Sequence, residues 1–116
     1  MTKIIKTTLV DILERPDEYL GKEVEVEGTM IYTGKTPRGP LYTVNLPEQD
    51  YCVGVLTSRG MRITCYGLEQ LCFEEYNNQR VVVIGLVKMI HNSVVLKVLS
   101  IKIAELEYEK AAKRKK

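Results

Sequence analysis

The sequence predicts a mainly β domain built as one small, strongly curved barrel, and three patterns indicate this. Charged and apolar residues alternate from Glu23 to Glu27, which is the two-residue period of a strand with one buried face. The alternation breaks at Gly28, and a glycine inside a strand pattern marks a bulge or a sharp bend. The run Val81–Ile84 is apolar at every position, as in a strand that is covered on both faces. One long strand over residues 22–34, bent in its middle, can therefore belong to two sheets.

Length and composition indicate a single domain. The chain has 116 residues, of which 45% are hydrophobic and 28% are charged, the balance of a globular protein that buries a core without disulfides or metal. We expect residues 1–106 to form this domain and residues 107–116 to be a charged tail, either a frayed helix or disordered. The sequence contains no run of about 18 apolar residues and no apolar signal-peptide core, so we expect a cytoplasmic protein without a membrane partner.

The residue types and spacings that carry catalysis or bind metal are missing from the sequence. Cys52, Cys65 and Cys72 are odd in number and never form a Cys-x-x-Cys spacing, so we expect small buried thiols rather than disulfides or zinc ligands. There is no phosphate-binding glycine loop, no Gly-x-Ser-x-Gly and no His-Glu-x-x-His. We therefore expect no catalytic residues, no metal and no cofactor, and a protein that is not an enzyme.

The formal net charge of +2 hides an uneven distribution of charge. Five of the 17 basic residues lie in residues 110–116, which leaves 12 bases against 15 acids, or −3, for residues 1–109. The stretch 76–104 has four bases and no acid, whereas acids crowd residues 11–27. Binding of nucleic acid would therefore depend on where the charges lie and not on their total.

The chain begins with a short strand or extended arm over Lys3–Thr7, followed by a helix over residues 8–15. Thr8 can cap this helix, and Asp11 lies at the third helical position, where a carboxylate favours the exposed amides. Pro16 is expected to end it. The apolar face of the helix consists of Leu9, Ile12 and Leu13.

The middle of the chain contains a loop and two or three strands. Residues 33–40 combine glycine, proline and bases, which is typical of an exposed loop, and a second strand is expected over Leu41–Leu46. Tyr51–Leu56 fits either the continuation of a hairpin or an extra short strand. The third barrel strand is expected over Met61–Tyr66, with alternating residues on its two faces. One face has Met61, Ile63 and Cys65, and the other has Arg62, Thr64 and Tyr66.

A helix and a hairpin complete the predicted domain. Residues 68–76 have helical spacing, with an apolar side made by Leu68, Leu71, Cys72 and Tyr76. Two further strands follow over Arg80–Ile90 and Ser93–Ile103, and the tight turn His91-Asn92 joins them.

This order of strand, strand, strand, helix, strand and strand resembles the OB (oligonucleotide/oligosaccharide-binding) fold, a five-stranded Greek-key barrel with a helix between strands 3 and 4. A short N-terminal helix precedes the barrel here. The resemblance covers residues 8–106. In residues 13–28 a helix leads through Gly21-Lys22 into a Val-x-Val-x-Gly strand, which is similar to the opening of tRNA-anticodon-type and replication-protein-A-type OB domains. Abundant Val, Ile, Glu and Lys also favour a thermophilic source. The resemblance implies an archaeal one.

The resemblance implies a ligand groove across the second and third strands, with the loops after the first and fourth strands as its walls. Tyrosine rings there would stack on bases, and Lys and Arg would contact phosphates. The residues placed at this groove are Tyr32, Lys35, Arg38, Tyr42, Arg62, Tyr66, Lys88, His91 and Asn92.

Each of these residues also has an ordinary structural interpretation. A strand tyrosine is often a half-buried sheet residue, Lys35 and Arg38 can keep a loop soluble, and His91 fits a turn better than a functional site.

Two functions therefore stay open. The first is binding of single-stranded DNA or RNA in replication, repair or RNA metabolism. The alternative is a protein-interaction module in a larger complex. The outward Glu row of residues 23–27 is unsuited to phosphate and is either solubilising or a partner surface. The sequence leaves the oligomeric state open.

Overall fold

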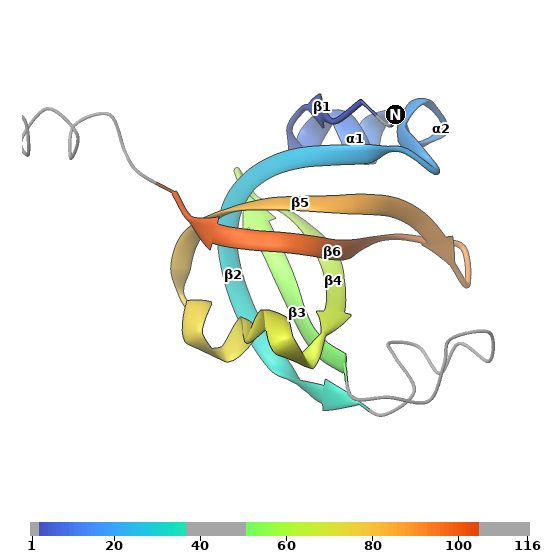
Figure 1. The fold of residues 1–116 in the computed structure, drawn as a ribbon. Helices are drawn as coiled ribbons and strands as arrows, with labels where there is room; N and C mark the ends of the chain where they lie inside the picture. The colour runs from blue at the N-terminus through green and yellow to red at the C-terminus, as the bar shows by residue number, and fades with distance from the viewer. Residues whose placement is uncertain (1–2, 37–50, 105–116) are drawn as a thin grey trace, which may run out of the picture.

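The computed structural model describes residues 3–36 and 51–104, which form a closed five-stranded barrel with one extra strand and short helices (Figure 1). The predicted fold class is confirmed. The barrel strands are β2 (Glu23–Thr36), β3 (Tyr51–Ser58), β4 (Met61–Leu68), β5 (Gln79–Ile90) and β6 (Ser93–Ile103). Strand β2 pairs with β3 and β5, β6 pairs with β5, and a parallel pairing of β4 with β6 closes the ring.

Strand β2 is the bent strand that the sequence predicts. Its residues 23–30 pair with β5 and its residues 29–36 pair with β3, so one strand serves both sides of the barrel. Val24, Val26 and Met30 are fully buried, and the glutamates between the valines point away from the core. Gly28 lies where the two pairings meet. A β-carbon there would be 2.6 Å from the backbone oxygen of Thr57, so the close approach of β2 to β3 requires glycine.

The N-terminal segment covers one end of the barrel. Strand β1 (Ile5–Lys6) runs parallel to the start of β2, and helices α1 (Leu9–Glu14) and α2 (Pro16–Tyr19) follow. Leu9 and Ile12 of α1 belong to the main hydrophobic core. Pro16 separates the two helices and starts the second, because proline is tolerated in a first helical turn.

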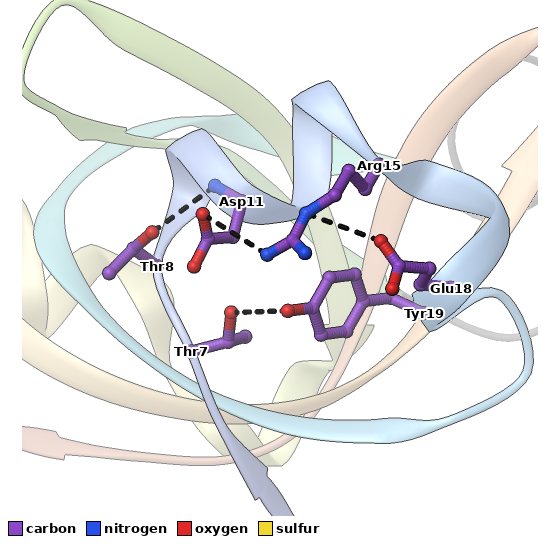
Figure 2. A network of polar contacts seen from close by, with 6 residues as sticks. All are labelled: Thr7, Thr8, Asp11, Arg15, Glu18 and Tyr19. Atoms are coloured by element: carbon purple, nitrogen blue, oxygen red, sulfur yellow. Dashed lines mark hydrogen bonds and ion pairs between the residues drawn. The ribbon is translucent and has the colours of Figure 1, made fainter.

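Polar contacts fix the corner between these two helices (Figure 2). The side chain of Thr8 accepts a hydrogen bond from the backbone N–H of Asp11 at 3.2 Å, which confirms the predicted cap. Arg15 lies 3.5 Å from Asp11 and 3.2 Å from Glu18. The Thr7 hydroxyl donates to the Tyr19 hydroxyl at 3.1 Å. The ion pairs are half-exposed, so they orient the corner more than they stabilise it.

The strand that follows β2 in the barrel differs from the predicted one. The predicted strand Leu41–Leu46 lies outside the described residues. Tyr51–Ser58, which the sequence left as a hairpin continuation or an extra short strand, is instead the full barrel strand β3 between β2 and β4. Its inward positions include Cys52, Gly54 and Leu56, all buried.

The segment between β4 and β5 is helical but is not one helix. It consists of two 3-10 turns, η2 (Glu69–Leu71) and η3 (Phe73–Tyr76), separated by Cys72 in the left-handed conformation with φ of 54°. This break rotates the second turn, so Phe73 points into the core and is fully buried, while Leu68 is 41% exposed. The predicted apolar face was therefore wrong at Leu68 and omitted the most buried side chain.

The hairpin of β5 and β6 matches the prediction. Ile90 pairs with Ser93, and His91 and Asn92 form the connection with φ of 50° and 63°. Positive φ at both turn residues is the geometry that continues the right-handed twist of the strands. In the apolar run, Val81 and Val83 are buried but Val82 and Ile84 stay partly exposed, so the outer face of β5 is not covered as expected.

Two of the three thiols are buried as predicted. Cys52 and Cys65 lie in the main core, whereas Cys72 is partly exposed. Burial raises the pKa of the Cys65 thiol to about 12, because a thiolate there would lose its hydration. A raised pKa is the opposite of what activates a cysteine nucleophile.

Alkaline solution tests this burial. The unfolded chain releases the Cys65 proton near pH 9, while the folded chain holds it to about pH 12. The stability that the neutral thiol contributes is therefore complete below pH 9 and falls between pH 9 and about 12. The free energy of unfolding should fall less steeply with pH in Cys65→Ala, by up to about 1.4 kcal/mol per pH unit. Urea unfolding from about pH 8 to 10.5 measures this slope. An unchanged slope in the variant would contradict a buried thiol.

Candidate nucleic-acid interface

The outer face of β3 and β4 is where the resemblance places a ligand. Three pairs of side chains point outward across these strands, namely Val53 with Tyr66, Val55 with Thr64 and Thr57 with Arg62. The face continues onto β6, because Thr64 pairs with Val95 and Tyr66 with Lys97. Arg62 is exposed, and most of the other outward side chains are partly exposed. The result is a mixed apolar and basic surface.

A second, smaller hydrophobic cluster lies on this face. It consists of Tyr51, Tyr66, Ile90 and Val95, all buried. The rings of Tyr51 and Tyr66 meet edge to face, with centroids 5.9 Å apart and planes at 68°. The Tyr66 hydroxyl is buried and has no hydrogen-bond partner among the described residues, and burial raises its pKa. In this arrangement Tyr66 presents no open ring face on which a base could stack.

Lys88 and the turn after it lie at one end of this cluster. Lys88 pairs with Val95 across the hairpin and is partly exposed. His91 and Asn92 are exposed in the turn, directly after Ile90 of the cluster. The structure thus brings Tyr66, Lys88 and the turn to one region, with Arg62 further along β4.

Tyr32 and Lys35 lie on the second half of β2 and contact the helical segment instead. The Lys35 ammonium is 2.9 Å from a carboxylate oxygen of Glu69, and this hydrogen bond raises the pKa of Lys35. Tyr32 is half-buried against the main core, and its backbone N–H donates to the side-chain oxygen of Asn77 at 2.9 Å. Arg38 and Tyr42 lie outside the described residues.

Charge is strongly polarised around the barrel. Strands β3 to β6 contain no Asp or Glu, and their bases are Arg62, Arg80, Lys88, Lys97 and Lys102. The acids of the barrel are on β2, at Glu23, Glu25 and Glu27. Of the bases on β3 to β6, Arg80 forms an ion pair, with its Nε 2.7 Å from Glu27. The outer face of β3, β4 and β6 is therefore positive without a compensating carboxylate on the same strands.

Two residues of this face were not predicted as site residues. Tyr51 was overlooked because its strand was not assigned to the barrel. Lys97 belongs to the acid-free stretch 76–104, and that charge pattern was the signal that could have identified it. Within residues 3–36 and 51–104, no group of three or more His, Cys, Asp or Glu side chains could hold a metal ion. None of the helices described in the structure is both long enough and apolar enough to cross a membrane.

The closed barrel of β2 to β6, with its parallel β4–β6 pairing and the helical segment between β4 and β5, is the OB fold. No protein-family model matches the sequence, and no curated protein matches it.

Solved structures share this fold. The second OB-fold domain of replication protein A from Methanococcus maripaludis has a TM-score of 0.56 and 15% identity, over 76% of this chain and 89% of that one. The structure of yeast Stn1 and Ten1 has a TM-score of 0.66 and 10% identity, over 95% of this chain and 68% of that one. A putative aspartyl-tRNA synthetase from Leishmania major has a TM-score of 0.62 and 14% identity. The match covers 90% of this chain but only 21% of the synthetase. At these identities the likeness establishes the fold.

Proposed function

We propose that the outer face of β3, β4 and β6 binds single-stranded nucleic acid, with Arg62 and Lys88 contacting phosphates. The observation that carries the proposal is the absence of any acid from β3 to β6, together with the bases that these strands present. Uncompensated bases on one face attract a polyanion even when the body of the domain is slightly acidic.

The chemistry of the face suits an extended strand. Val53 and Val55 on β3 and Thr64 on β4 give a partly exposed, mainly apolar floor, against which sugars and bases can pack. Lys35 can join the site only by exchanging Glu69 for a phosphate. His91 and Asn92 are further candidate contacts at the edge of this floor.

Tyr32, Tyr66, Arg38 and Tyr42 remain proposed contacts of the same site. Tyr66 would have to leave its cluster to stack on a base. Two of the similar domains belong to replication protein A and to a tRNA synthetase, whose names connect them with replication and with tRNA. This agrees with a role in replication, repair or RNA metabolism.

Fluorescence-anisotropy titrations of labelled oligo-dT and oligo-U at two salt concentrations test the proposal. We expect Arg62→Ala and Lys88→Ala each to weaken binding by up to about fivefold, the effect of one exposed ion pair of about 1 kcal/mol. Each should also reduce the slope of log affinity against log salt by about 0.7, as for one lost phosphate contact on a single strand.

Lys3→Ala is the matched control, since Lys3 is an exposed base that precedes β1 and lies outside the proposed face. It should bind as the unchanged protein does. The proposal is contradicted if no salt-sensitive binding occurs below about 100 µM, which is the weak end of non-specific affinity. Equal losses in the control and in the two site variants would also contradict it.

A further inference from the structure

The outer face of β2, β5 and β6 carries three parallel rows of side chains, two of which run acid, apolar, base. Strand β5 lies in the middle, and the register places a glutamate of β2 on one side of each row and a residue of β6 on the other. The rows are Glu23–Leu86–Lys97, Glu25–Ile84–Ser100 and Glu27–Val82–Lys102. An acidic column, an apolar column and a basic column therefore run side by side along the strands.

The apolar column is open to solvent. Val82, Ile84 and Leu86 are partly exposed, and Leu99, at the register shift of β6, is 45% exposed. Central strands that are apolar on both faces are normally covered on both. An uncovered apolar stripe between charged columns is typical of an interaction surface.

Most of the flanking charges have no partner within the described chain. Glu27 is paired with Arg80, and Glu25 has Lys6 of β1 beside it in the register. Glu23, Lys97 and Lys102 make no hydrogen bond or ion pair with any described residue. The row through Leu86 thus has a free acid at one end and a free base at the other.

This pattern is complementary to itself. If a second copy faces the first across a two-fold axis parallel to β5, the rotation exchanges the two sides of the strand. Each acidic column then faces the basic column of the other copy, and the apolar columns meet along the axis. Facing sheets pack about 10 Å apart, a distance that Glu and Lys side chains can span together. At both ends of the Leu86 row, Glu23 of one copy would form an ion pair with Lys97 of the other.

We propose that this face is the interface between two copies of the chain, arranged about a two-fold axis parallel to β5. An isologous contact of this kind needs one self-complementary patch, which the three rows provide. Arg62, on β4, lies outside the rows, whereas Lys88 is the next outward residue of β5 after Leu86 and Lys97 belongs to the first row. The dimer therefore leaves Arg62 open and competes with nucleic acid for Lys88 and Lys97. The inference does not depend on the proposed ligand.

Sedimentation equilibrium with charge-reversal variants tests the arrangement. We expect the protein to dimerise at about 100 µM in low salt, and Glu23→Lys or Lys97→Glu to raise the dimer dissociation constant at least about tenfold. Each variant brings like charges together at both ends of the row, which is repulsive. An equimolar mixture of the two variants should restore the dimer, because the Lys at 23 faces the Glu at 97 and the native Lys97 faces the native Glu23.

Glu75→Lys is the matched control, because it makes the same charge change on the exposed surface of η3, away from the rows. It should leave the dimer unchanged. A monomer at about 100 µM in low salt, a mixture that stays monomeric, or an equal effect of Glu75→Lys would each overturn the proposal. Circular dichroism of every variant checks that the barrel is intact.

Discussion

Replacing Phe73 with alanine is expected to lower the free energy of unfolding by about 3–5 kcal/mol, the range for removal of a buried aromatic ring. Phe73 is fully buried in the main core. Its ring lies over backbone that has no side chain, since a β-carbon on Gly54 would be 3.5 Å from it and one on Gly67 would be 3.4 Å from it. Surrounding structure relaxes only partly into the space that a removed ring leaves, so most of the cavity should remain. Urea unfolding followed by circular dichroism measures the loss.

Leu68→Ala is the control for this experiment. The helical periodicity of residues 68–76 predicts that Leu68 is buried, whereas the structure leaves it 41% exposed. We expect the Leu68 variant to lose less than about 1 kcal/mol, as surface substitutions usually do. A larger loss for Leu68 than for Phe73 would contradict the left-handed break at Cys72 and favour one continuous helix.

Gly28→Val is expected to destabilise the barrel by about 3 kcal/mol or more. Its β-carbon would lie 2.6 Å from the backbone oxygen of Thr57 and 3.1 Å from Leu56, so β2 and β3 would have to separate. Overpacking of a filled interior typically costs about 1–3 kcal/mol, and more where the obstacle is backbone. Thermal and urea unfolding compared with the unchanged protein give the effect.

The neighbouring substitution Thr29→Val is the matched control for Gly28. Thr29 follows Gly28 on the same strand, is partly exposed and has the β-branched shape that strands favour. It should change the stability by less than about 0.5 kcal/mol. If the two variants had similar stability, β2 would not press on β3 at this point.

Local patterns were sufficient where one element decides its own shape. Alternation from Glu23 to Glu27 and the break at Gly28 predicted a bent strand, because a side chain's face follows from its position along the strand. The cap at Thr8 and the His91-Asn92 turn depend on residues within one turn of chain, and both are present as predicted. The exposure of Arg62 follows from the same alternation.

The candidate site depended on contacts that no local pattern contains. Tyr66 points to the outer face as predicted, yet it is buried, because Tyr51, Ile90 and Val95 come from three other strands to cover it. Lys35, although exposed, is paired with Glu69, a residue 34 positions away. Neither contact could be read from the spacing of residues in β2 or β4.

The sequence by itself determined that the chain is mainly β, that β2 bends at Gly28, and that residues 76–104 contain bases without acids. Only the tertiary structure decided that Tyr51–Ser58 is a barrel strand, that Phe73 fills the core, and that the glutamates, the outer apolar residues of β5 and the lysines of β6 form continuous rows. The physical reason is that periodicity specifies which face of an element is apolar. Which distant residues meet that face is set by strand register and barrel closure.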